Sequence, residues 1–203
     1  MGEDRKKEAA YSEKMNHFLG YLNQIVPLTP AAEEAINGIT VFRTLPKNTI
    51  LLRNGEVCHE FHFLEKGLAR VFYYKDGKEV TAWFSSENQV ISAIDSLFTG
   101  LSSMYNIEIL EDSKVWSLQY QKLEPLFEKH QQVERLGRLL ITQNYLLLDE
   151  RMKLFAFCTA EERYERLLLQ ISDILQRVKL GQIASYLGIS QEHLSRIRAG
   201  YKK

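Results

Sequence analysis

The residues whose types and spacing best suit recognition chemistry lie at positions 180–199, in the stretch LGQIASYLGISQEHLSRIRA. Apolar residues recur there at the spacing of two short helices. Those expected to face inward are Ile183, Leu187, Leu194 and Ile197. The outer side chains of the second helix are polar, as base-reading side chains in a DNA groove are. Together with a nearby lysine they are the candidate DNA-binding residues: Ser190, Gln191, Glu192, Ser195, Arg196, Arg198 and Lys202.

Three small residues support a helix-turn-helix. Ala184 lets the second helix cross close above the first, and Gly188 stands in the turn, where a positive φ costs glycine nothing. Ser190 is placed to cap the second helix at its N-terminus. An ordinary helical hairpin explains the apolar positions. It does not explain Ala184 and Gly188 at these offsets beside arginine-rich outer positions. The pattern therefore predicts binding of double-stranded DNA.

The distribution of charge agrees with this prediction. The chain has 26 basic and 26 acidic residues, so its net charge is zero. Residues 1–158 hold 18 basic and 21 acidic residues, whereas residues 174–203 hold six basic residues and a single acid, Glu192. The six are Arg177, Lys179, Arg196, Arg198, Lys202 and Lys203. Positive charge is thus concentrated where DNA phosphates would lie.

The hydrophobic pattern changes along the chain and predicts the helices and strands that position this motif. Residues 1–10 are expected to be a frayed, charged tail, and helical spacing follows at 11–25 and 31–37. Between Ile39 and Leu118, short β-branched and aromatic runs alternate with turn signals, which predicts an antiparallel barrel or jelly roll. Asp76-Gly77 is the sharpest hairpin signal. A short helix is expected at 122–129, with Pro125 in its first turn.

A long helix is expected at residues 131–157, with apolar residues on two faces. One face would pack on the barrel, and the other would meet a partner helix in a homodimer. The expected dimer interface is Val133, Leu136, Leu140, Leu147 and Leu154. The alternative is a helix buried inside one monomer. After it, Thr159 and Glu162 form a capping box that starts a new helix, so a domain boundary is placed at 158/159.

Composition excludes several classes of protein. Hydrophobic residues make up 45% and charged residues 26% of the chain, which excludes collagen and low-complexity disorder. The two cysteines, Cys58 and Cys158, form no CxxC pair, which excludes a disulfide framework and a zinc finger. The chain shows no signal peptide and no apolar run of membrane length. A cytoplasmic protein without a membrane partner is expected.

From about residue 20 to residue 200 the chain resembles the Crp/Fnr family of bacterial transcription regulators. The runs at 161–164 and 183–189 look like its Bacteroidetes-type branch. The resemblance implies an α+β fold with an antiparallel β jelly-roll (double-stranded β-helix) sensor domain, a long dimerisation helix and a C-terminal (winged) helix-turn-helix domain. The implied parts are an N-terminal tail and helices (1–37), a cyclic-nucleotide-binding-like β-roll (38–120), a short helix with the dimerisation helix (121–158) and the DNA-binding domain (159–203).

The resemblance also implies partners and roles. Family members are homodimers, so the operator should be near-palindromic, and RNA polymerase is a further partner. The family's recognition pattern Arg/Gln-Glu-x-x-x-Arg falls on Gln191, Glu192 and Arg196. Arginine can grip guanine and glutamate can accept from cytosine. Glu192 and Arg196 can also pair with each other across one helical turn.

The phosphate cassette of the cyclic-nucleotide-binding members is not matched. Its Gly-Glu and Arg-Ser slots fall on a degenerate effector pocket: Ser92, Ala93, Asp95, Ser102, Ser103 and Met104. No Lys or Arg occurs between Lys78 and Lys114, and a buried phosphate without a cation is costly. We therefore expect no cofactor and no response to cAMP. An unknown neutral or weakly charged small effector would fit. A regulator that responds to cAMP or another small effector through a non-standard pocket is the alternative.

The alternative from another class is a cupin-like metal enzyme, suggested by His59, His62 and Glu65. Cupins need His-x-His on one strand, because alternate residues face the same side. His59 and His62 are instead three positions apart, and no third histidine follows in the barrel. We therefore expect no catalytic residue, no metal site and no enzyme activity.

Overall fold

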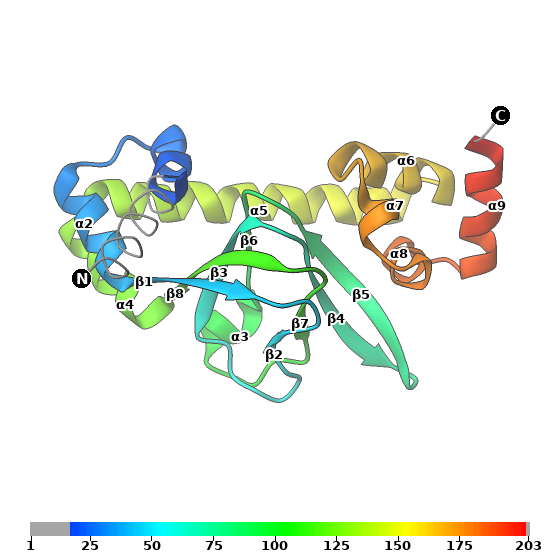
Figure 1. Cartoon of the computed structure of the whole chain (residues 1–203), viewed down its shortest axis with the longest axis horizontal. Helices are drawn as coiled ribbons and strands as arrows, with labels where there is room; N and C mark the ends of the chain where they lie inside the picture. Colours follow the sequence, from blue (N-terminus) through cyan, green and yellow to red (C-terminus); the bar gives the residue numbers. More distant parts are fainter. Residues whose placement is uncertain (1–16, 202–203) are drawn as a thin grey trace, which may run out of the picture.

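The computed structural model describes residues 17–201, apart from the side chain of Tyr201, and contains two four-stranded antiparallel sheets (Figure 1). One sheet has the order β1-β8-β3-β6: Thr40–Leu45, Ser113–Gln119, Glu60–Lys66 and Gln89–Ile91. The other has the order β2-β7-β4-β5: Ile50–Leu52, Asn106–Ile109, Ala69–Lys75 and Lys78–Ser85. The sheets face each other, and the predicted antiparallel jelly roll is confirmed.

The hairpin between β4 and β5 shows how local sequence sets this fold. Lys75 pairs with Lys78, and the two residues between them have positive φ angles, 51° at Asp76 and 73° at Gly77. Two positive φ values define the tight turn whose twist matches that of the flanking strands. The hairpin predicted from Asp76-Gly77 between two strand-like runs is therefore confirmed.

The interior of the barrel is filled by apolar side chains from both sheets. Leu64, Ile107 and Val115 are fully buried in this cluster. The short helix α3 (Ile94–Thr99) closes one side and adds Leu97 to the same core. The two sheets therefore form a rigid support for the helices around them.

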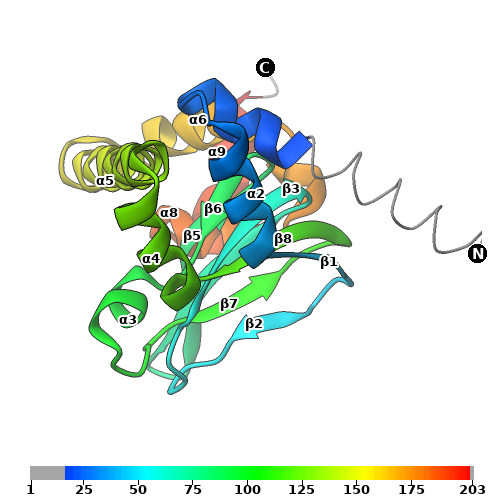
Figure 2. The same cartoon turned by 90° about the vertical axis from the view of Figure 1, so that its left-hand side faces the viewer.

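Four helices form a second core along one side of the barrel. They are an N-terminal helix at residues 17–25, α2 (Pro30–Ile39), α4 (Tyr120–Lys129) and α5 (Gln131–Phe157). Phe18 stacks on Trp116 of β8, with ring centroids 5.5 Å apart. Figure 2 looks along α5 and shows α2 and α4 gathered near its first turns. The predicted tail and the first residues of the helix predicted at 11–25 lie outside the described residues.

One detail of α4 corrects the sequence expectation. The helix begins at Tyr120 and not at 122, so Pro125 lies inside it rather than in its first turn. Proline lacks the N–H of an interior helical bond. The sequence pattern therefore placed the start of this helix two residues too late. The long helix, in contrast, has the predicted bounds.

The remaining helices form a C-terminal helical unit, residues 159–201: α6 (Ala160–Gln170), α7 (Ile174–Arg177), α8 (Leu180–Leu187) and α9 (Gln191–Tyr201). The predicted capping box is confirmed, since Thr159 and Glu162 each bond to the other's backbone N–H. The expected wing is not found in the described part of this unit. Residues 159–201 contain helices and no strand.

The helical unit is docked on the barrel and shares a third core with it. Phe84 of β5 packs on Tyr186 of α8, with ring centroids 5.1 Å apart. β5 is an edge strand, and the backbone N–H of Thr81 on this strand donates to the Ser185 hydroxyl of α8 at 2.8 Å. Helix α8 therefore covers a sheet edge. Within residues 17–201, no helix is long and apolar enough to cross a membrane.

Candidate nucleic-acid interface

Helices α8 and α9 are joined by a tight turn at residues 188–190. Gly188 has a φ of 70°, as predicted, and the Ile189 N–H bonds back to the carbonyl of Ala184 at 3.1 Å. The Ser190 hydroxyl accepts from the backbone N–H of His193 at 3.1 Å, so its predicted N-cap role is confirmed. The turn thus fixes the angle between the helices by backbone geometry and one cap.

The inner faces of the two helices are buried together. The four predicted inward-facing residues are at most 6% exposed: Ile183, Leu187, Leu194 and Ile197. Ala184 is also buried, at 2% exposure. This packing holds α9 in place from one side only and leaves its other side to solvent.

The outer face of α9 points away from the barrel, at the far end of the molecule in Figure 1. The exposed candidates are Ser190, Gln191, Glu192, Ser195 and Arg196. Arg198 is half-buried, and Lys202 lies outside the described residues. Gln191 differs from the others, because it also lines a hollow beside α8.

Glu192 is held in its charged form at the start of α9. Its own backbone N–H, followed by the Ser190 hydroxyl, keeps the pKa of Glu192 below its usual range, with a smaller contribution from Arg196. A helix N-terminus favours negative charge. Glu192 therefore presents a carboxylate acceptor, and Arg196 a cationic donor, on the same exposed face.

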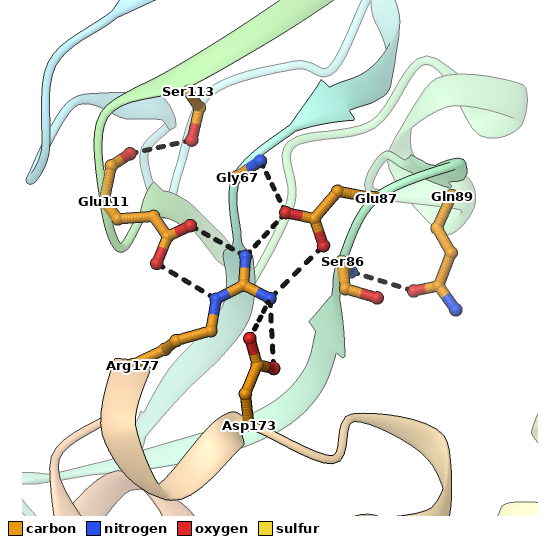
Figure 3. A network of polar contacts seen from close by, with 8 residues as sticks. All are labelled: Gly67, Ser86, Glu87, Gln89, Glu111, Ser113, Asp173 and Arg177. Atoms are coloured by element: carbon orange, nitrogen blue, oxygen red, sulfur yellow. Dashed lines mark hydrogen bonds and ion pairs between the residues drawn. The ribbon is translucent and has the colours of Figure 1, made fainter.

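Arg177 corrects the charge argument made from the sequence. Its side chain is 13% exposed and pairs with Glu87, Glu111 and Asp173 (Figure 3). It is therefore not available to phosphates. Two of its partners lie 90 and 66 residues away in the sequence, so no local count of charge could have found them.

A polar hollow of about 510 Å³ lies between the barrel and the helical unit. Arg70 of β4 faces it and is held by Glu108 at 2.7 Å and Glu79 at 2.6 Å. Lys179 and Gln182 line the other side. These residues come from three strands and one helix segment, so no local sequence pattern brings them together.

The expected effector pocket is closed by its own hydrogen bonds. The Ser92 hydroxyl donates to the carbonyl of Glu60 at 2.9 Å, and the backbone of Ser103 exchanges two bonds with Gly55 and Glu56. Nearby, the Ser96 hydroxyl accepts from the backbone N–H of Cys58 at 2.9 Å. These polar groups are already satisfied within the chain.

The other expected pocket residues are divided between core and surface. Ala93 is buried and precedes α3, whereas Asp95 and Ser102 are exposed. Met104 is 53% exposed. The six expected residues therefore differ in exposure, with Ala93 and Ser103 buried and Asp95, Ser102 and Met104 exposed.

The long helix carries an exposed apolar stripe that differs from the expected one. Val133 and Leu136 are 1% and 4% exposed, because the N-terminal helices and Trp116 cover them. They have no surface left for a partner, which corrects that part of the expected interface. Leu140, Leu147 and Leu154 are half-buried. Five of the large side chains that remain exposed recur at alternating spacings of four and three and form the stripe: Ile141, Tyr145, Leu148, Met152 and Phe155.

The residues considered for a cupin site are used elsewhere. The His62 imidazole is 3% exposed and hydrogen-bonds with Ser117 at 2.9 Å. Glu65 accepts from the indole N–H of Trp116 at 2.7 Å. His59 lies outside the strands, just before β3. Among the residues that the structure describes, no three His, Cys, Asp or Glu side chains are arranged to hold a metal ion.

Comparison with known proteins gives a family match for the barrel and several solved structures with a similar fold. Residues 42–130 match the family model of the cyclic nucleotide-binding domain. FixK2 from Bradyrhizobium japonicum is similar with a TM-score of 0.68 and 20% identity, over 80% of this chain and 84% of that one. The chain matches none of the curated proteins with which it was compared.

Two further structures cover most of both chains. A transcriptional regulator of the Crp/Fnr family from Eubacterium rectale gives a TM-score of 0.66 and 17% identity, over 86% of this chain and 84% of that one. The c-di-GMP responsive global regulator CLP of Xanthomonas campestris gives a TM-score of 0.63 and 16% identity, over 86% of this chain and 92% of that one. At such identities the likeness establishes a common fold.

Proposed function

We propose that this chain is a sequence-specific DNA-binding transcription regulator of the Crp/Fnr type, with α8 and α9 as its helix-turn-helix. The observation that carries the proposal is the pair of helices joined at Gly188, buried on the inner face and polar on the outer face of α9. The common fold with Crp/Fnr regulators supports it. No catalytic role is proposed.

In this proposal α9 enters the major groove as the recognition helix. Arg196 contacts guanine O6 and N7, and Glu192 accepts from cytosine N4. The remaining candidates contact phosphates or further base edges: Ser190, Gln191, Ser195, Arg198 and Lys202. Because Arg177 is paired with carboxylates, it takes no part in this contact.

The proposed assembly is a two-fold homodimer through α5. The exposed stripe that includes Ile141, Leu148 and Met152 has the spacing of a coiled-coil seam, which a second copy of the helix would bury. A two-fold dimer presents two recognition helices about 34 Å apart, so the operator would be near-palindromic. RNA polymerase is the further partner of such a regulator in the cytoplasm.

The barrel is proposed to act without a cyclic nucleotide. The segment where a phosphate would be held contains no Lys or Arg, and its serines bond within the chain. The alternative is a small effector, cAMP included, in a non-standard pocket, which the match to the cyclic nucleotide-binding domain favours.

Selection from a random double-stranded DNA pool tests the proposal, with and without cell extract as a source of effector. We expect enrichment of one near-palindromic sequence by the full chain. Arg196→Ala serves as the matched variant, because its side chain is exposed and makes no contribution to the core. The absence of any enriched sequence in both conditions would contradict the proposal.

A further inference from the structure

Arg177 joins the helical unit to one end of the barrel by an unusually complete set of bonds. Its Nε and Nη2 atoms donate to the two carboxylate oxygens of Glu111 at 3.1 and 2.7 Å. Its Nη2 and Nη1 atoms donate to the two oxygens of Glu87 at 2.8 and 3.2 Å. A further bond from Nη1 reaches Asp173 at 3.3 Å. All five guanidinium N–H donors therefore have carboxylate acceptors.

Two of the acceptors, Glu87 and Glu111, belong to barrel turns that are far apart in the sequence (Figure 3). Glu87 lies between β5 and β6, and Glu111 lies between β7 and β8. Glu87 also accepts from the backbone N–H of Gly67 at 2.9 Å, which adds the turn between β3 and β4. One side chain of the helical unit thus contacts two of the turns directly and reaches the third through Glu87.

The same turns supply the apolar half of the junction. Leu68 and Leu110 are buried in the core that also contains Ile174 and Ile183 of the helical unit. The backbone N–H of Leu110 donates to the carbonyl of Leu68 at 2.8 Å, so the two turns are tied together. The ion pairs of Arg177 with Glu87 and Glu111 lie beside this apolar core and add the polar half of the junction.

Only Val178 and Lys179 separate α7 from α8, and Val178 is buried. A displacement of Arg177 is therefore passed to α8 and, through the turn at Gly188, to α9. In this docked arrangement the outer face of α9 stays exposed. The arrangement is thus open to DNA.

We propose that Arg177 is a positioning residue, which holds the recognition helix at a fixed orientation on the barrel so that the three turns set the geometry of DNA binding. This inference rests on the proposed function. The strands that meet at these turns also line the barrel interior, so a change in the interior would reach α9 by this route. Lysine cannot replace Arg177, because one ammonium group cannot bond two carboxylates bidentately.

The test combines two measurements on the full chain with Arg177→Gln, Arg177→Lys and Glu111→Gln. Hydrogen exchange of the Thr81 amide reports docking, since its partner is Ser185 across the junction. Exchange of amides inside α8 and α9 reports folding of the helical unit. Affinity for the selected DNA reports function. Arg43→Gln is the matched control, because Arg43 makes a bidentate pair with Glu60 inside the barrel.

We expect Arg177→Gln and Glu111→Gln to speed Thr81 exchange and to weaken DNA binding by about tenfold, as the loss of bonds to a charged group implies. Base preference and the protection of α8 and α9 should be unchanged, and the control should behave as wild type. Arg177→Lys should show the same Thr81 exchange rate and the same DNA affinity as Arg177→Gln, rather than those of wild type.

Wild-type affinity in both variants would overturn the inference, and so would a gain in affinity, which would make the docked arrangement inhibitory. Faster exchange without an affinity change would overturn it as well. If wild type binds no DNA at all, the proposed function fails. The exchange rates then still decide whether Arg177 holds the unit on the barrel. Glu111→Gln leaves the sequence of the helical unit intact and separates docking from folding.

Discussion

The ring of Phe155 in α5 lies against Gly188 in the turn between α8 and α9: a Cβ on Gly188 would be only 2.9 Å from Phe155 Cε1. Phe155 also belongs to the exposed stripe of α5, with 45% of its surface accessible. One turn earlier, the Arg151 guanidinium lies 3.8 Å from the centroid of the Tyr186 ring. The end of the long helix therefore contacts α8 and the turn between α8 and α9 directly.

Gly188→Ala should destabilise the chain by about 2 kcal/mol, because a left-handed conformation costs a side chain roughly 1–2 kcal/mol and the new methyl group would also collide with Phe155. Denaturant unfolding measures the change. Gly200→Ala is the control, since nothing lies within 4 Å of its Cβ position. Equal stability of the two variants would contradict the proposed role of the turn.

Arg196→Ala should cost about 1–3 kcal/mol of binding free energy on the selected DNA and should relax preference at one base pair. Fluorescence anisotropy against the selected site and its single-base variants measures both. Arg53→Ala, an exposed arginine of the barrel, controls for net charge. Unchanged affinity and preference would remove Arg196 from the base-reading residues.

Leu148→Asp should convert the proposed dimer to monomer, because an unpaired charge in an apolar seam costs several kcal/mol. Sedimentation at micromolar concentration gives the oligomeric state, and DNA affinity should fall with it. Leu146→Asp is the control: it lies on the same helix, is 58% exposed and is outside the stripe. A wild-type chain that sediments as monomer, or equal effects of the two variants, would contradict the proposed seam.

Millimolar cAMP or cGMP should give no heat in calorimetry and no shift in melting temperature, since only a ligand of the native state stabilises it. The physical reason is that residues 79–113 contain no Lys or Arg. Arg70, the nearest arginine in the sequence before this segment, is already held by Glu79 and Glu108. Saturable binding in the micromolar range would contradict this expectation and direct attention to Lys114.

Stability should rise with pH between about 4 and 6.5 because of His62. Burial lowers the pKa of His62 to about 4, with an opposing effect of Glu60. In this range the unfolded chain binds a proton that the folded chain excludes, so acidification favours unfolding, by roughly 3 kcal/mol in all. The difference between wild type and His62→Gln in unfolding free energy across this range isolates the contribution. A constant difference would contradict it.

Features governed by neighbouring residues were predictable from the sequence. The turn at Asp76-Gly77, the capping box at Thr159 and the N-cap at Ser190 depend on a few adjacent residues, and all three are confirmed. The bounds of the long helix followed from its unbroken periodicity.

Features set by tertiary packing were not predictable in the same way. Periodicity places Val133 on an apolar face of the long helix, but it does not show that the chain's own N-terminal helices cover this residue. A count of charges along the sequence could not exclude Arg177 from the residues expected to meet DNA phosphates, because Glu87 and Glu111 approach it only in the folded chain. Which apolar or charged residues remain available to a partner is decided by long-range contacts.

The bond from Thr81 to Ser185 has a consequence for how the chain can be divided. A barrel cut after Phe157 would lose the helix that covers β5, and an uncovered edge strand offers its N–H groups to other chains. It would also expose Leu68, Phe84 and Leu110. We therefore expect the isolated barrel to aggregate. A chimera that takes its helical unit from another protein would need the matching barrel turns as well. The apolar and charged groups of the two surfaces contact each other and must therefore be exchanged together.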